Sequence, residues 1–247
     1  MIPIKTRQEI ELMQQAGKIL ASVMDEVSCL IRPGLATLSL DVAAGEAMTR
    51  RGVVSAFKGY KGYPAIICVS VNETVVHGIP GPKKLIVGDI VSLDMGICKD
   101  GFYVDMAKTF AVGKIQDDKQ LLLDVACASL KEAIGAMKPE NRLFDISWAV
   151  QNHVESRGFS VVKDFVGHGI GRELHEEPQI PNFGQPHSGP VLKDGMVFAI
   201  EPMVNSGTWE IEVLEDGWTA VTKDRKPSAH FEHTVAILDG QPVVLTA

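Results

Sequence analysis

Several features are missing from this 247-residue chain, and each absence excludes a class of protein. No run of about 18 apolar residues occurs, so no membrane span is expected. The first residues, Met-Ile-Pro-Ile-Lys-Thr-Arg-Gln-Glu, lack the apolar segment of a signal peptide. An excess of basic residues is also missing, because 31 acidic and 24 basic side chains leave a net charge of −7. A nucleic-acid partner needs a basic surface and is therefore not expected.

Cysteines are few and scattered along the chain. The four of them, at positions 29, 68, 98 and 127, show no Cys-x-x-Cys spacing. This spacing argues against a disulfide framework and against a zinc knuckle. We therefore expect a reducing compartment, the cytoplasm.

What the sequence does contain is clearest between Asp94 and Asp105. Residues 90–97 and 102–111 alternate like the strands of a β-hairpin around Lys99-Asp100-Gly101. Paired positions in a hairpin with a two- or four-residue loop have an odd sum, so both aspartates point to the same face. A solvated face would carry Lys or Glu, whereas this face carries Ser, Gly, Ala and Thr. Small residues around two repelling carboxylates favour a cavity that holds a cation.

Other elements follow from hydrophobic periodicity. A capping box at Thr6 to Glu9 begins a helix that ends before Arg32-Pro33-Gly34, and further helices are predicted over 39–50, 121–137 and 145–156. Strands are predicted over 65–71, 159–166, 196–204 and 229–238, with a second hairpin over 210–222.

The sequence contains a short repeated pattern. Residues 88–94 and 195–201 both read Gly-x-apolar-apolar-x-apolar-acid, and each follows two helices and a strand. This order predicts two structural halves, about 1–115 and 116–247, related by a pseudo-twofold axis. Such halves would bring Asp94, Asp105, Glu201 and Glu232 to one central sheet.

The two glutamates lie in apolar strands without a basic partner. Residues 197–204 around Glu201 and 229–238 around Glu232 contain no Lys or Arg. Each glutamate alone could be a buried side chain bonded to the backbone or to an arginine, because an unpaired buried carboxylate costs several kcal/mol. Together with the two aspartates, they favour divalent metal, as two ions bridged by carboxylates.

A nitrogen ligand is available beside these acids. His168 lies between two glycines, which leave its imidazole unobstructed, although a histidine in such a place is more often a loop residue without a role. Oxygen-rich ligation with one imidazole suits Mn, Fe(II), Co or Zn better than a structural zinc site.

The five residues Asp94, Asp105, His168, Glu201 and Glu232, in this order, resemble the dinuclear metal set of the methionine aminopeptidases and their pita-bread relatives. The strings at 72–80, 167–171, 200–202 and 231–234 agree as well. The chain looks like a type I enzyme, because no large insertion separates the histidine from the first glutamate. The resemblance implies an α+β pita-bread fold: a single catalytic domain over residues 1–247, with a central antiparallel sheet covered by helices.

The resemblance also implies an activity, the removal of the initiator methionine from nascent proteins with a small second residue. A water that bridges two divalent metal ions would attack the scissile carbonyl, with Glu201 as general base that passes the proton to the leaving amine. His175 matches a position at the substrate carbonyl or amide, and His77 one near the peptide nitrogen. Without the resemblance, both would be ordinary loop histidines.

The methionine pocket follows from the same resemblance. Tyr60, Tyr63, Cys68 and Trp218 match side chains that line it, and aromatics with a thiol suit a thioether. Plain core packing is the alternative for these four residues. Leu174 stands where an aromatic residue is expected in close relatives.

Further partners are implied. Asn72 and Ser228 match a monovalent-cation site in some members of the family. The expected partners are nascent peptide N-termini, with the ribosome as a candidate meeting place, for a monomeric protein that binds neither membranes nor nucleic acid.

Two alternatives stay open. Another pita-bread peptidase, an Xaa-Pro aminopeptidase or prolidase, usually carries an additional N-terminal domain and different residues around its histidines. A non-catalytic binding protein on the same fold would lose metal ligands, whereas all five are present here.

Overall fold

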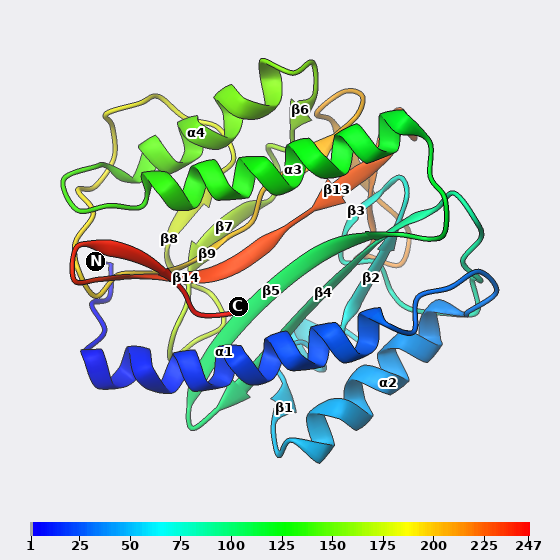
Figure 1. Ribbon diagram of the computed structural model, residues 1–247, viewed down its shortest axis with the longest axis horizontal. Helices are drawn as coiled ribbons and strands as arrows, with labels where there is room; N and C mark the ends of the chain where they lie inside the picture. Colours follow the sequence, from blue (N-terminus) through cyan, green and yellow to red (C-terminus); the bar gives the residue numbers. More distant parts are fainter. Residues whose placement is uncertain (1) are drawn as a thin grey trace.

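A curved antiparallel sheet runs through the centre of the protein in the computed structural model, which describes residues 2–247 (Figure 1). Its strands are β1 (Val54–Ser55), β2 (Cys68–Val71), β4 (Ile90–Lys99), β5 (Phe102–Ala111), β7 (Val166–Gly169), β8 (Glu176–Pro181), β9 (Val197–Ile200), β14 (Glu232–Leu238) and β15 (Gln241–Val244). The order is β1-β4-β5-β14-β9-β7-β8, with β2 beside β4 and β15 beside β14. Strands from both ends of the sequence therefore meet in one sheet.

The predicted hairpin is confirmed. β4 and β5 pair from Ile90 opposite Ala111 to Lys99 opposite Phe102. The turn consists of Asp100 and Gly101, with φ values of 52° and 79°, as the preferred two-residue hairpin turn requires. Asp94 lies opposite Ala107 and Asp105 opposite Gly96, so the two aspartates share one face as diagonal neighbours.

Three strands predicted as continuous are each broken in two, and these predictions were wrong in that respect. One piece of each predicted strand lies in the main sheet, and the other pieces form a small sheet in the order β13-β10-β6. Its members are β6 (Ser160–Val161), β10 (Met203–Asn205) and β13 (Ser228–His230). One break falls at Pro202, which has no N–H for a ladder and whose carbonyl accepts from the Phe231 N–H at 3.3 Å. The chain thus leaves the main sheet beside Glu201 and Glu232.

The other predicted hairpin, over 210–222, is confirmed. It consists of β11 (Ile211–Val213) and β12 (Ala220–Thr222), and β12 also pairs with β3 (Thr74–Val76).

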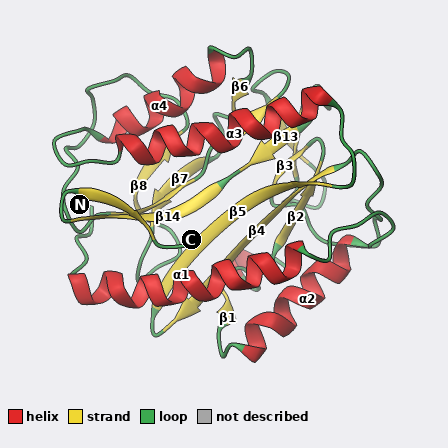
Figure 2. Cartoon of the chain, viewed as in Figure 1, coloured by secondary structure: helices red, strands yellow, loops and turns green. Residues whose placement is uncertain are grey.

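Helices cover the sheet in two pairs (Figure 2). They are α1 (Arg7–Ser28), α2 (Thr37–Arg50), α3 (Asp117–Ala136) and α4 (Leu143–Glu155), and a short 3-10 turn spans Tyr60–Gly62. The first helix packs on β4 and β5, whereas α3 and α4 pack together over strands from the second part of the sequence. The predicted capping box at Thr6 is present. No helix in residues 2–247 is long and apolar enough to cross a membrane.

The architecture agrees with the expected α+β fold with a central antiparallel sheet. One hydrophobic cluster lies under α1 and α2 and a second one under α3 and α4. The pseudo-twofold relation between residues 1–115 and 116–247, and the treatment of the chain as one catalytic domain, stay predictions.

The seam between β5 and β14 is short. The two strands share only two register pairs, one of them at Glu232. Threonine hydroxyls continue the pairing on both sides. Thr109 Oγ1 accepts from the N–H of His230 at 2.9 Å and donates to its carbonyl at 2.8 Å, and Thr234 Oγ1 does the same with the N–H and carbonyl of Asp105, at 2.9 and 2.8 Å. The two threonine side chains thus form hydrogen bonds that the backbones of β5 and β14 would otherwise form with each other.

Candidate metal centre and substrate pocket

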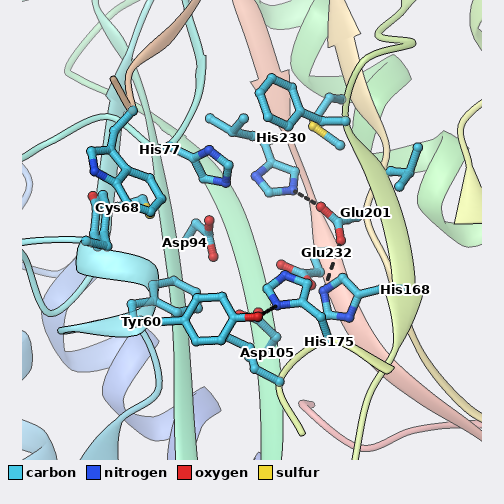
Figure 3. Close-up of a pocket in the computed structure, with 18 of the residues that line it drawn as sticks. Tyr60, Cys68, His77, Asp94, Asp105, His168, His175, Glu201, His230 and Glu232 are labelled. Atoms are coloured by element: carbon cyan, nitrogen blue, oxygen red, sulfur yellow. Dashed lines mark hydrogen bonds and ion pairs between the residues drawn. The ribbon is translucent and has the colours of Figure 1, made fainter. Parts of the chain in front are cut away.

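A pocket of about 260 Å³ contains all five predicted metal ligands (Figure 3). They come from neighbouring strands of the main sheet, in the order β4, β5, β14, β9 and β7: Asp94, Asp105, Glu232, Glu201 and His168. Glu201 directly follows β9, at the point where the chain bends toward the small sheet. Residues from distant parts of the sequence are thus brought together.

The ligand atoms lie close enough to share an ion. One atom each from Asp105, His168 and Glu232 lies within 4.8 Å of the other two. His168 Nε2 lies 3.4 Å from Glu201 Oε1. One oxygen each of Asp94, Asp105 and Glu232 is buried without any hydrogen-bond partner. Buried polar atoms without a hydrogen-bond partner are rare in folded proteins. These three oxygens therefore indicate that the pocket binds a ligand that interacts with them.

Charge is concentrated here without compensation. Within residues 2–247, no ion pair joins a lysine or arginine to any of the four carboxylates. Burial, followed by the charges of neighbouring acids, raises the pKa of Asp94, Glu201 and Glu232 well above their usual range. Burial also raises the pKa of Asp105 to about 7. Each carboxylate would be stabilised by a cation in the pocket.

The residues fit divalent metal. His168 Nδ1 lies 2.9 Å from the Gly169 carbonyl, so the N–H belongs on Nδ1, and Nε2 faces the acids with its lone pair. This backbone contact is the usual support of a metal-binding imidazole. Burial lowers the pKa of His168 to about 3, which keeps the ring neutral and able to coordinate. Four carboxylates with one imidazole are ligands for hard or borderline divalent ions.

The other two predicted histidines lie in the same pocket. His175 Nδ1 is 2.8 Å from the Tyr60 hydroxyl, and the two rings stack with centroids 5.1 Å apart. His77 has φ 59°, a left-handed conformation that is costly for a residue other than glycine and is concentrated at functional sites. Its ring lies perpendicular to that of Phe165, with the ring centroids 5.1 Å apart. Burial lowers the pKa of both histidines, so both are neutral at pH 7.

The profile of metallopeptidase family M24 matches residues 11–239. The chain belongs to this family. It is 50% identical over 246 residues to a methionine aminopeptidase from Clostridium perfringens, covering 100% of this chain and 99% of the relative. The structure of a methionine aminopeptidase from Thermotoga maritima superimposes with a TM-score of 0.97 at 49% identity, covering 100% and 99% of the two chains.

A more distant structure, the prolidase from Pyrococcus furiosus, superimposes with a TM-score of 0.81 at 22% identity, covering 99% of this chain and 65% of the prolidase. This likeness confirms the pita-bread fold alone. Among these matches, similarity over the whole length is to the methionine aminopeptidases, so this M24 chain belongs with them, as its sequence motifs predict.

The predicted methionine-binding residues also line the pocket of this M24 chain. The rings of Tyr63 and Trp218 form a T-shaped pair with centroids 5.1 Å apart, and the Tyr63 hydroxyl donates to the Gly78 carbonyl at 3.0 Å. The tyrosine hydroxyl is thereby satisfied, and its ring is available for an apolar ligand. Burial, followed by the Asp94 charge, raises the pKa of the Cys68 thiol, which keeps it an uncharged, polarizable group. The wall therefore combines aromatic rings with sulfur.

His230 also lines the pocket, although the sequence motifs assigned it no role. His230 is 2% exposed, and its Nε2 atom lies 3.8 Å from Glu201 Oε2 without a hydrogen-bond partner. Figure 3 shows its ring between His77 and Glu201. Its position two residues before Glu232 could have indicated this, because alternate residues of a strand share a face.

The monovalent cation expected near Asn72 and Ser228 stays a prediction, although the side chains of both residues have partners within the protein. Asn72 Oδ1 already accepts from the Ile90 N–H at 3.1 Å and from Lys119 Nζ at 3.0 Å. The backbone carbonyl of Asn72 accepts from the Ser228 N–H at 2.8 Å. The Ser228 hydroxyl donates to the Val204 carbonyl at 3.3 Å. The side chains of both expected ligands are therefore engaged by groups of the protein.

Proposed function

We propose that this M24 chain is a metal-dependent methionine aminopeptidase that removes the N-terminal methionine from nascent proteins with a small second residue. The observation that carries the proposal is the set of four carboxylates and one imidazole in a single pocket, with unpaired buried oxygens and no basic partner among the described residues. Full-length similarity to methionine aminopeptidases supports it.

The metal centre holds two divalent ions in this proposal, as Co, Mn, Fe or Zn. Asp94, Asp105 and Glu232 would hold the pair, and His168 and Glu201 would be the remaining ligands. The donor set supports this choice, because carboxylates and a neutral imidazole are common ligands of these ions. When bound, the metal supplies the acidity that makes water a nucleophile near neutral pH and polarises the scissile carbonyl.

Glu201 is the general base. Its side chain is 14% exposed, so it reaches the cavity while remaining largely shielded. A raised pKa lets the carboxyl group hold a proton taken from the attacking water and then deliver it to the leaving amide nitrogen. His175 lies at the open side of the pocket and binds the substrate carbonyl or amide. His77 contacts the peptide nitrogen.

The tautomer of His175 is consistent with such a role. If the Tyr60 hydroxyl donates to Nδ1, the remaining N–H is on Nε2 and is free to donate to a substrate oxygen. The contact at 2.8 Å and the ring stacking hold the imidazole in one orientation. Tyr60 thus acts through His175 as well as lining the pocket.

The size and lining of the pocket suit one methionine side chain. About 260 Å³ is below the 300–1,000 Å³ of typical drug-sized sites. Tyr63, Trp218 and Cys68 would contact the thioether by sulfur–aromatic and dispersion contacts. Leu174 is 2% exposed in the same wall and makes this part of the pocket aliphatic.

The cellular setting is proposed from the same chemistry. Nascent peptide N-termini are the partners, met at the ribosome by a monomeric enzyme in the cytoplasm. The support for a reducing compartment is the scattered spacing of the four cysteines.

The decisive experiment measures methionine release from Met-Gly-Met by the purified protein with Mn²⁺ or Co²⁺. The Glu201→Gln variant should lower turnover by about 10²–10⁴-fold, because it cannot take up the proton. A matched control is Glu215→Gln, which changes an exposed glutamate outside the pocket and should retain full activity.

Two results would reject the proposal. Turnover that persists in Glu201→Gln, or after complete removal of metal by a chelator, would exclude the assigned chemistry. Cleavage of an Xaa-Pro peptide in preference to Met-Gly-Met would favour the prolidase alternative.

A further inference from the structure

The mouth of the pocket carries two charged side chains. Three of the residues that line the pocket are exposed, namely Lys61, Asp164 and His175, and the others are buried or half-buried. These three residues therefore mark the opening to solvent. In the proposed function, on which this inference rests, the methionine lies inside the pocket and the rest of the peptide leaves through this mouth. Its charges are thus placed to act on the residues that follow the scissile bond.

A tight turn over Tyr60–Gly62 holds Lys61 at the mouth. Lys61 has φ 48°, in the left-handed region, and the nearby Gly59 and Gly62 have φ values of 86° and 90°. The Gly59 N–H donates to the Tyr63 carbonyl at 2.8 Å, and the Tyr63 N–H donates to the Tyr60 carbonyl at 2.9 Å. Glycine would adopt the conformation of Lys61 at lower cost. Because such strain is concentrated at ligand-binding sites, a lysine here indicates a use for its side chain.

The ammonium group of Lys61 lies beside the substrate-binding histidine and lacks an anionic partner. Lys61 Nζ is 5.4 Å from the centroid of the Tyr60 ring, which stacks on the His175 ring at 5.1 Å. Burial, followed by the Lys61 charge, lowers the pKa of His175. Within residues 2–247, Lys61 forms no ion pair. Its charge is therefore available to a ligand.

The opposite charge at the mouth belongs to another segment. Asp164 precedes Phe165, whose ring lies perpendicular to that of His77 with centroids 5.1 Å apart. No ion pair joins Asp164 to Lys61 among the described residues. Deeper in the pocket, two divalent ions would balance the four carboxylates of the proposed metal centre. A peptide that passes along the Lys61 side of the mouth therefore meets a positive charge.

We propose that Lys61 determines specificity, so that peptides with an acidic third residue are cleaved in preference to those with a neutral or basic one. The second residue is small in the proposed function, so the third is the first whose side chain can carry a charge. A carboxylate there would pair with the exposed ammonium, whereas an ammonium would be repelled by it. Exposed ion pairs are weak, so the expected preference for acid over amide is about two- to fivefold in kcat/KM.

The test compares three peptides with the metal-loaded protein at low ionic strength. They are Met-Ala-Glu-Gly, Met-Ala-Gln-Gly and Met-Ala-Lys-Gly, each with a C-terminal amide, so that only the third side chain differs. The parent chain should give the highest kcat/KM for the glutamate peptide and the lowest for the lysine peptide. The differences should vanish in about 1 M KCl, where the Debye length is about 3 Å.

Variants assign the preference to one residue. Lys61→Gln should give equal kcat/KM for the glutamate and glutamine peptides, and Lys61→Arg should keep the preference. Lys58→Gln is the matched control, because Lys58 is exposed in the same loop and does not line the pocket. It removes the same charge from the protein and should select as the parent does. Asp164→Asn should also keep the preference.

The inference is overturned if the parent chain cleaves the glutamate and glutamine peptides equally well, or if Lys61→Gln still prefers the acid. The salt dependence of the parent chain needs no variant, so it decides the case in which Lys61→Gln does not fold. The glutamine peptide tests the proposed function separately. Its cleavage without any preference for glutamate would refute this inference alone, whereas no cleavage of any of the three peptides would refute the proposed function and this inference with it.

Discussion

Removal of the divalent metal should make Asp105 a source of instability at neutral pH. This residue is 5% exposed, and burial raises its pKa from 3.8 to about 7. The unfolded chain keeps the ordinary pKa, so between about pH 4 and pH 7 the folded state binds more protons and its stability falls as the pH rises. At about 1.4 kcal/mol per pKa unit, ionisation of Asp105 costs the folded metal-free protein about 4 kcal/mol above pH 7.

Asp105→Asn isolates the free-energy cost of this ionisation, because asparagine has a similar shape and carries no charge. In a chelator at pH 8, urea denaturation should give the variant a free energy of unfolding about 4 kcal/mol above that of the parent chain, and at pH 4 the two should agree. The buried histidines titrate in both proteins and cancel in the difference. Asp100→Asn, at the exposed hairpin tip, is the control and should change little.

Bound metal should reverse the order of stability of the parent chain and Asp105→Asn. With saturating Mn²⁺ the parent chain becomes the more stable protein, because the variant lacks a charged ligand and binds the ion less tightly. Equal stabilities of the parent chain and Asp105→Asn in chelator at pH 8 would refute the reasoning, since the aspartate would then be compensated within the protein.

Three further outcomes are expected. Tyr60→Phe removes the 2.8 Å contact with His175, and kcat for Met-Gly-Met should fall by about 5–10-fold while the thermal midpoint stays constant; an unchanged kcat would contradict this. His230→Leu should lower kcat by roughly tenfold and His230→Gln should restore it, because glutamine again offers an N–H to the carboxylate it faces; calorimetric metal affinity should not change. Lys5→Met breaks a buried ion pair with Glu176 and should lower the free energy of unfolding by about 3–5 kcal/mol in urea titrations; adding Glu176→Gln should recover part of it.

The sequence predicted the features that depend on neighbouring residues. The shared face of Asp94 and Asp105 follows from the parity of hairpin pairing, which holds whatever the rest of the chain does. The capping box at Thr6 is equally local. The clustering of acids could be inferred because Glu201 and Glu232 lie in strands without basic residues.

Features that depend on tertiary contacts were not predictable in this way. The break between β9 and β10 arises where the chain passes from one sheet to another, and the apolar pattern continues across it. The start of α3 lies at Asp117, four residues before the predicted position 121, because its first turn is polar and carries no periodic signal. The contact of Lys119 with Asn72 joins segments that no sequence pattern links.

The seam between β5 and β14 gives metal loading a mechanical consequence. One strand carries Asp105 and the other carries Glu232, and few backbone hydrogen bonds join them. An ion held by both carboxylates would be a cross-link along this short line of the sheet. Chelation should therefore speed deuterium uptake by backbone amides along this line before it does so within the long β4–β5 hairpin, so that the chemistry of the centre and the rigidity of the sheet depend on the same ion.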